Sequence, residues 1–270
     1  SEKEITLKDP PVSEILTEKL IVKIRNKPIN PKIILNIQEK NDVILTSSLF
    51  DSDFDYLNLD KRQFVKTVLP IIINENQNII TTRKFLINLK DKLQKFKTLD
   101  KKEIKKLNTI ANKYNIKYLE THKLDLIDEI LLSVDVIPNS IALAQAAIES
   151  GWGKSRFAKE YNALFGEYTY DQNKGVVPLK REQGDRHLIK SFSSYDNSVS
   201  SYFKNINSHN AYQEFRKVRN IMRLKNNFSN ISLLVNNLNS YAEDDNYIKT
   251  LNSVIKNNNF TKFDSKIISY

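Results

Sequence analysis

Residues 141–166 have the sequence IALAQAAIESGWGKSRFAKEYNALFG. The first half predicts a short helix that starts at Pro138 and Asn139 and ends at Gly151, which fits the left-handed position that commonly closes a helix. Its buried stripe consists of apolar residues at helical spacing, namely Ile141, Ala144 and Ile148. The many alanines of this helix indicate that it packs closely against its neighbours.

Glu149 lies at the C-terminal end of this helix, next to Ser150, Gly151 and Trp152. A carboxylate there meets the negative end of the helix dipole and a low-dielectric surface, and both effects raise its pKa. A general acid that works near neutral pH requires such a raised pKa. Glu149 is therefore a candidate general acid. The alternative is a helix-end glutamate in solvent or in a structural salt bridge.

The pattern changes to β-type runs over residues 166–192. GEYTY, VVPLK and HLIKSF are separated by turn sequences at residues 173–175 and 183–185, which predicts a small antiparallel β lobe. The lobe supplies three carboxylates, Glu167, Glu182 and Asp185. Glycosidases pair two carboxyl groups across a cleft, or use one acid with help from the acetamido group of the substrate. A helix end that faces a β lobe suits such a pair, although each lobe carboxylate taken alone fits a solvated turn residue equally well.

Helical periodicity covers most of the remaining chain from Asp60 onward. The first helix continues past Pro70, and Asp100 with Glu103 forms a capping pair for the second. Further helices are predicted around residues 124–131, 199–206, 212–218, 231–238 and 247–255. Mostly helix with one short β insertion predicts an α+β fold that is mainly α.

Residues 1–58 follow a different pattern. Short apolar runs are interrupted by prolines, namely Pro10, Pro11, Pro28 and Pro31, which is typical of extended segments or short strands. We expect an N-terminal linker or accessory segment over residues 1–58 and a catalytic domain over residues 59–270.

Composition narrows the classes of function. The net charge of +10 suits an anionic partner such as nucleic acid, a membrane surface or a bacterial wall. The absence of cysteine excludes a disulfide scaffold, a thiolate zinc site and a catalytic thiol. His122, His187 and His209 show no ligand spacing, so we predict neither a metal site nor a cofactor. The polar N-terminus is not a signal peptide, so either the protein is cytosolic or a leader or anchor has been removed.

The run LAQAAIESGWGKSRFAKEYNALFG, residues 143–166, resembles the signature of the glucosaminidase domains of glycoside hydrolase family 73, and most closely their Bax-like bacterial branch. The resemblance continues through residues 175–180 and 191–216 and reaches back to residues 61–76. It covers about residues 54–263, and its most specific elements are ESGWG and LFG. It implies a lysozyme-like fold that hydrolyses the bond after N-acetylglucosamine in peptidoglycan glycan strands.

The resemblance also implies catalytic residues. The acid of the family motif matches Glu149, and the best positional match for the second carboxylate is Glu182. A late tyrosine linked to activity falls in SYAEDDNYIKTL, which points to Tyr241 with Tyr247 behind it. Asp245 stands where the family usually has proline, so the local turn departs from the family pattern.

Several further residues are candidates for substrate contact. Gln145 lies one turn before Glu149 on the same helix face, where it would line the floor of the cleft. Tyr168 and Tyr170 of the lobe are candidate sugar platforms, with strand packing as the alternative. The others are Trp152 and Phe165, which fit sugar contacts or core packing, and Asn162, which fits a hydrogen-bond donor or a helix cap.

Three alternatives remain. A muramidase or lytic transglycosylase would keep the fold and the acid but change the bond or the product. A wall-binding module would keep the cleft without turnover. A basic helical nucleic-acid binder suits the charge, but the sequence contains no recognition motif for nucleic acid, so we expect none as a partner. The substrate predicts a periplasmic or cell-surface location, with membrane anchoring through a segment outside the given sequence.

Overall fold

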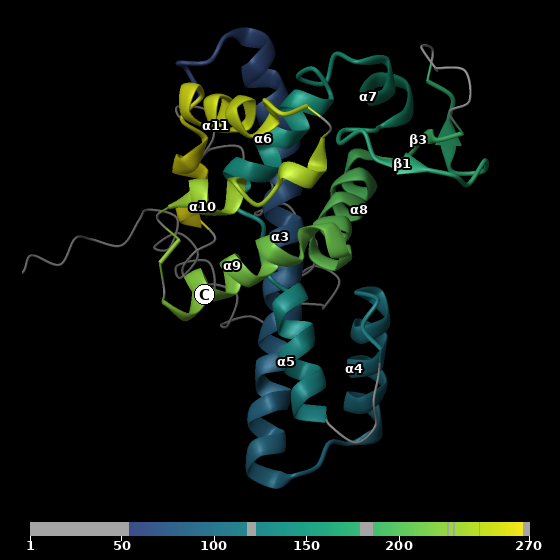
Figure 1. Ribbon diagram of the computed structural model, residues 1–270, viewed down its shortest axis with the longest axis vertical. Helices are drawn as coiled ribbons and strands as arrows, with labels where there is room; N and C mark the ends of the chain where they lie inside the picture. The colour runs from purple at the N-terminus through teal and green to yellow at the C-terminus, as the bar shows by residue number, and fades with distance from the viewer. Residues whose placement is uncertain are drawn as a thin grey trace, which may run out of the picture. The chain divides into compact units, whose positions relative to one another are not determined.

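The computed structural model describes residues 54–117, 123–178, 186–225, 227–228, 230–242 and 244–266 (Figure 1). The chain divides into two units, Ser1–Asn58 and Leu59–Tyr270. Of the first unit, residues 54–58 are described, and the Leu57 amide donates to the Phe54 carbonyl oxygen at 2.9 Å in a turn. Glu182 and Asp185 of the predicted lobe lie outside the described residues.

Helix α3 (Leu59–Phe96) is the longest element of the second unit. It runs through Pro70, as the sequence predicts, and it spans about 57 Å at 1.5 Å per residue. The second half of α3 packs beside α5 (Lys123–Ser133), and α4 (Lys101–Lys113) contacts α5 in turn (Figure 1). The predicted capping box of α4 is confirmed, because Asp100 accepts from the Glu103 amide and Glu103 accepts from the Asp100 amide.

Helix α6 (Asn139–Glu149) lies at the centre of the second unit and contacts α3, α11 and η3. Residues 139–147 are all buried, so this part of the helix is enclosed on every side, whereas Ile148 of the predicted buried stripe is only partly buried. Small alanines make this possible, because they let the neighbouring elements approach closely. The end of α6 is thereby fixed by packing from three directions.

The N-terminus of α6 is capped from the far end of the chain. The residue before the helix is Pro138, whose side chain makes no cap hydrogen bond. Asp264 of η3 (Phe260–Lys266) takes that role, since its carboxylate accepts from the Ser140 amide at 2.8 Å and from the Ser140 hydroxyl at 2.6 Å. Asn76 of α3 donates to the Asn139 side chain at 3.0 Å. Buried amides at a helix start need such partners, so the C-terminal segment completes the central helix.

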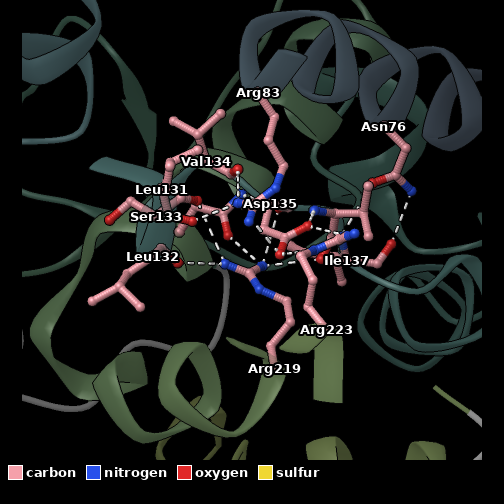
Figure 2. Close-up of polar contacts among 12 residues, drawn as sticks. Asn76, Arg83, Leu131, Leu132, Ser133, Val134, Asp135, Ile137, Arg219 and Arg223 are labelled. Carbon is pink, nitrogen blue, oxygen red and sulfur yellow. Dashed lines mark hydrogen bonds and ion pairs between the residues drawn. The ribbon is translucent and has the colours of Figure 1, made fainter. Parts of the chain in front are cut away.

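The link between α5 and α6 is held by a buried charged cluster, shown in Figure 2, which we call the Asp135 cluster. It consists of Asp135, Arg83 of α3, and Arg219 and Arg223 of α9 (Gln213–Leu224). Arg223 forms two hydrogen bonds to the Asp135 carboxylate at 2.5 and 2.6 Å, and Arg83 lies 3.5 Å from it. Burial acts to raise the pKa of Asp135, but the neighbouring arginines outweigh it and lower this pKa overall.

The arginines of the Asp135 cluster also cap the end of α5. Arg219 is fully buried and donates to the carbonyl oxygens of Leu132 and Val136 at 3.0 Å. Arg83 donates to the carbonyl oxygens of Leu131 and Val134. These carbonyl groups have no partner within the helix and lie at its negative end, so they favour cations. One carboxylate and several carbonyl dipoles therefore offset the charge of one fully buried arginine and two partly buried ones.

The β lobe is a three-stranded antiparallel sheet with the order β1-β3-β2. Its strands are β1 (Tyr168–Thr169), β2 (Gly175–Val176) and β3 (Leu188–Lys190), with Tyr168 and Val176 both opposite Ile189. A Cβ at Gly175 would lie 2.5 Å from the Leu188 Cβ, so this tight pairing requires glycine. The prediction of a mainly α fold with a small antiparallel lobe is confirmed.

Six further helices complete the described part of the second unit. They are α7 (Arg156–Tyr161), α8 (Tyr195–Ser208), η1 (Asn210–Tyr212), α10 (Ile231–Val235), η2 (Asn239–Tyr241) and α11 (Tyr247–Asn257). Helix α8 packs against α3, and α11 packs against α6 (Figure 1). In the described part of the chain, no helix combines the length and the apolar character needed to cross a bilayer.

Candidate active site

The candidate site is built on the turn that follows α6. Glu149 is the last residue of the helix, and Gly151, Trp152 and Gly153 after it all have left-handed φ values, of 57°, 59° and 74°. The left-handed residue expected at Gly151 is confirmed. The Trp152 amide donates to the Ala147 carbonyl at 2.8 Å, which closes the helix end as in a Schellman motif. The Ser150 hydroxyl accepts from the Gly153 amide at 2.8 Å, so the turn that carries Glu149 is rigidly bonded.

The carboxyl group of Glu149 is mostly removed from water. Burial raises the pKa of Glu149 to about 7, although a hydrogen bond from the Tyr247 hydroxyl acts to lower it. Gly166, at the entrance to the β lobe, has a φ of 61°, and a Cβ there would lie 3.4 Å from Glu149 Oε2. The backbone of the LFG element therefore passes directly over the carboxyl group. A carboxyl with this pKa is protonated in part at neutral pH, which suits a general acid.

A network of hydrogen bonds between buried side chains orients the Glu149 carboxyl group. Gln145, which is fully buried, donates to the Tyr247 hydroxyl at 2.8 Å, and Tyr247 hydrogen-bonds Glu149 in turn. The Gln145 carbonyl oxygen accepts from the Tyr202 hydroxyl at 2.5 Å. The side-chain amide of Gln145 hydrogen-bonds to both tyrosine hydroxyls. Because the Tyr247 oxygen accepts a hydrogen bond from this amide, its own proton is directed to Glu149. Gln145 therefore does not contact Glu149 directly but positions the Tyr247 hydroxyl that does.

Tyr241 lies beside Tyr247 in a stacked arrangement, with ring centroids 5.7 Å apart. Its hydroxyl donates to the Phe165 carbonyl oxygen at 2.9 Å. Phe165 is buried and stacks on Tyr202 at 3.9 Å. The three tyrosines and Phe165 thus join α8, η2 and α11 to the LFG element next to Glu149.

The first lobe carboxylate, Glu167, follows Gly166 directly. Its side chain is only 7% exposed, and its Oε2 accepts from Lys190 Nζ and Ser201 Oγ, each at 3.0 Å. Burial raises the pKa of Glu167, and the Lys190 ammonium acts in the opposite direction. Glu167 therefore links the lobe to α8 through Lys190 and Ser201.

The other residues predicted to contact substrate differ in their packing and in their exposure to solvent. Trp152 packs edge-on against Phe64 at 5.7 Å and Phe260 at 6.1 Å, between α3 and η3. Asn162 ends α7 in a left-handed conformation and donates to the Phe192 carbonyl. Tyr168 and Tyr170 are exposed on the lobe, at 62% and 79%. Among the described residues, no group of three or more acidic or histidine side chains is arranged to hold a metal ion.

A family model described as mannosyl-glycoprotein endo-beta-N-acetylglucosaminidase matches residues 125–260, a stretch that contains Glu149, the lobe and Tyr247. The chain belongs to the glucosaminidase family. It is 32% identical over 182 residues to Protein bax of Escherichia coli strain K12, which covers 67% of this chain. The chain spans 63% of the length of that relative. The predicted resemblance to Bax-like glucosaminidases of family 73 is confirmed.

Among solved structures, the chain is similar to the catalytic domain of the autolysin Auto from Listeria monocytogenes. The similarity has a TM-score of 0.38 at 20% identity, and it covers 66% of this chain and 96% of the other. Membership of the glucosaminidase family places the matched segment among glycoside hydrolase domains.

The candidate site contains one residue that the sequence analysis placed only within a predicted helix. Tyr202 lies on the buried face of α8 with no exposed surface, yet its hydroxyl reaches Gln145. A signal was present, because a tyrosine on the apolar stripe of a helix must find a buried partner for its hydroxyl. The partner itself was not predictable, since it lies 57 positions away in the chain.

Proposed function

We propose that this chain is a peptidoglycan hydrolase, an endo-β-N-acetylglucosaminidase that cleaves the glycan strand after N-acetylglucosamine with Glu149 as the general acid. The observation that carries this proposal is the partly buried carboxyl of Glu149, whose pKa of about 7 suits a general acid and which lies within the segment that matches the glucosaminidase family. Such a substrate lies in the cell wall. We therefore also propose a periplasmic or cell-surface location.

In the proposed reaction, protonated Glu149 donates its proton to the glycosidic oxygen as the bond to the anomeric carbon breaks. An oxocarbenium-like centre develops at that carbon. Either the substrate's own acetamido oxygen captures this centre and water then opens the resulting ring to release the reducing end, or a water activated at Glu182 attacks the centre directly. The first route retains the anomeric configuration and the second inverts it, so product stereochemistry distinguishes the two.

The aromatic wall beside Glu149 has a supporting role in this proposal. Tyr247 holds the carboxyl through its hydroxyl, and Tyr241 stacks on Tyr247 while bonding to the LFG backbone. We propose that Tyr241 orients the acetamido group or stabilises developing charge. The exposed rings of Tyr168 and Tyr170 on the lobe are suited to stack on sugar rings.

The products of digestion test the proposed bond. Purified sacculi digested by the wild type, reduced with borohydride and analysed by mass spectrometry should show new reduced N-acetylglucosamine ends. Reduced muramic acid ends would instead show a muramidase, and anhydro-muramic ends a lytic transglycosylase. Binding to sacculi without any new ends would show a wall-binding module and overturn the proposed activity.

Replacing Tyr247 with Phe should move the alkaline limb of the pH dependence of kcat upward by about one pH unit. The Tyr247 hydrogen bond lowers the pKa of Glu149, so its loss leaves the carboxyl protonated to higher pH. Turnover of soluble glycan fragments between pH 5 and 9 would measure the shift.

The matched control is Tyr241→Phe, because the Tyr241 hydroxyl donates to a carbonyl oxygen and not to Glu149. This variant should leave the alkaline limb in place, whatever its effect on kcat. An unchanged limb in Tyr247→Phe would contradict the role assigned to that hydroxyl.

A further inference from the structure

A groove lies along one side of α11, beside the turn that follows Glu149. It has a volume of about 470 Å³, and its walls include the first turn of α3, the Trp152 ring and the outer side of α11. Tyr247 and Leu251 of α11 face the protein interior, whereas Asn246, Lys249 and Thr250 line this groove. We call it the Trp152 groove.

The chemistry of the Trp152 groove favours an anion with amide groups. Lys61 and Lys249 both line it, and none of its described lining residues is acidic. The Lys61 ammonium lies 4.6 Å from the centroid of the Trp152 ring and donates to Asn258 Oδ1 at 2.9 Å, so its position is held. The other polar groups are side-chain amides and hydroxyls, which match the N–H and C=O groups of a peptide.

The groove is also within reach of the proposed reaction site. Trp152 lines the groove, and three residues of chain span at most about 11 Å. Along the chain, Trp152 follows Glu149 by three positions through the bonded turn. An extended peptide covers about 3.3–3.6 Å per residue, so three or four residues span this distance.

We propose that the Trp152 groove binds the peptide stem that peptidoglycan carries on alternate sugars, with Lys61 and Lys249 receiving its carboxylates. The inference rests on the proposed function, because it takes the glycan at Glu149 as given. A neutral sugar chain would offer hydrogen-bond acceptors but no negative charge to the two ammonium groups. Nucleic acid is disfavoured, because a polyanion is normally matched by an extended row of cations, and this groove contributes two.

The test uses Trp152 as a built-in probe, since the chain contains one tryptophan. Binding is measured by tryptophan fluorescence in a Glu149→Gln background, which prevents turnover. The ligands are a disaccharide-tetrapeptide fragment of peptidoglycan, a peptide-free oligomer of N-acetylglucosamine and a short single-stranded DNA. The stem-bearing fragment should change the emission with saturation, and added Lys249→Gln should weaken its binding about fivefold at low salt.

Lys256→Gln is the matched control, because Lys256 is an exposed lysine on the same helix that does not line this groove. It should leave the affinity for the stem-bearing fragment unchanged. Equal affinity for the peptide-free oligomer, an equal response to DNA, or no effect of Lys249→Gln would each overturn the inference.

The two proposals fail in different measurements. If wild type yields no new reducing ends from sacculi, the proposed hydrolysis fails even when the fragment binds in a Lys249-dependent way. If wild type yields N-acetylglucosamine ends but Lys249→Gln binds the fragment as tightly as its parent, the groove inference fails. The proposed hydrolysis is then still supported.

Discussion

Replacing Glu149 with Gln is expected to reduce kcat on peptidoglycan by roughly two to four orders of magnitude. The amide keeps the size of the carboxyl but has no proton to donate to the leaving oxygen. Release of reducing ends from purified sacculi would measure the loss. In the wild type, the rate should fall as the pH rises above about 7, because burial raises the pKa of Glu149 to about 7 and only the protonated form acts.

The control for this variant is Glu160→Gln. Glu160 lies on the neighbouring helix α7 with an exposed side chain that lies 3.7 Å from Arg156. It should keep wild-type turnover, and both variants should show the wild-type circular dichroism spectrum. A Glu149→Gln protein with full activity would show that the acid lies elsewhere.

Replacing Asp135 with Asn is expected to lower the free energy of unfolding by about 3–5 kcal/mol, the usual cost of leaving buried charges without their partner. The Asp135 carboxylate is 2% exposed and receives two hydrogen bonds from Arg223, with Arg83 also within ion-pair distance. Asparagine would remove the carboxylate that faces the fully buried Arg219 and the partly buried Arg83 and Arg223. Urea unfolding followed by tryptophan fluorescence would measure the change.

The pH dependence of stability gives a second readout of the same cluster. The pKa of Asp135 is lowered in the folded protein, so its stabilising contribution is present above its unfolded pKa of about 3.9. That contribution is lost as the pH falls through the folded pKa. The stability difference between wild type and Asp135→Asn should therefore shrink in acid.

Asp128→Asn is the matched control, because Asp128 also belongs to the α5 region and forms an ion pair, with Lys90 at 2.5 Å. Its side chain is 51% exposed, so water screens the pair and the loss should stay below about 1 kcal/mol. Equal losses in the two variants would contradict the importance given to burial at Asp135.

Local features of this protein were predictable wherever they depend on neighbours in the chain. The capping box of Asp100 and Glu103 joins residues three positions apart. The left-handed end of α6 follows from Gly151, and the three strands of the lobe follow from short β-type runs between turns. Glu149 stood out because a helix end and its flanking residues already imply a dipole and an apolar surface.

The pairing of distant residues was decided by the tertiary structure alone. Asp264 caps Ser140 from 124 positions away, and Arg219 reaches the end of α5 from more than 80 positions away. The Gln145 amide selects Tyr247, more than 100 positions on, as the hydroxyl that contacts the acid. Sequence periodicity identifies which face of a helix is buried, but not which distant element packs against that face.

The sequence by itself therefore determined the fold class, the central helix and the candidate acid at the end of that helix. The tertiary structure decided the pKa of Glu149, since burial raises this pKa, with the Gly166 backbone close to the carboxyl group, and one tyrosine hydroxyl acts to lower it. The physical reason is the distance along the chain over which each kind of interaction acts. Helix caps, turns and dipoles act within a few residues along the chain, whereas desolvation and buried hydrogen bonds exist only once distant segments pack together.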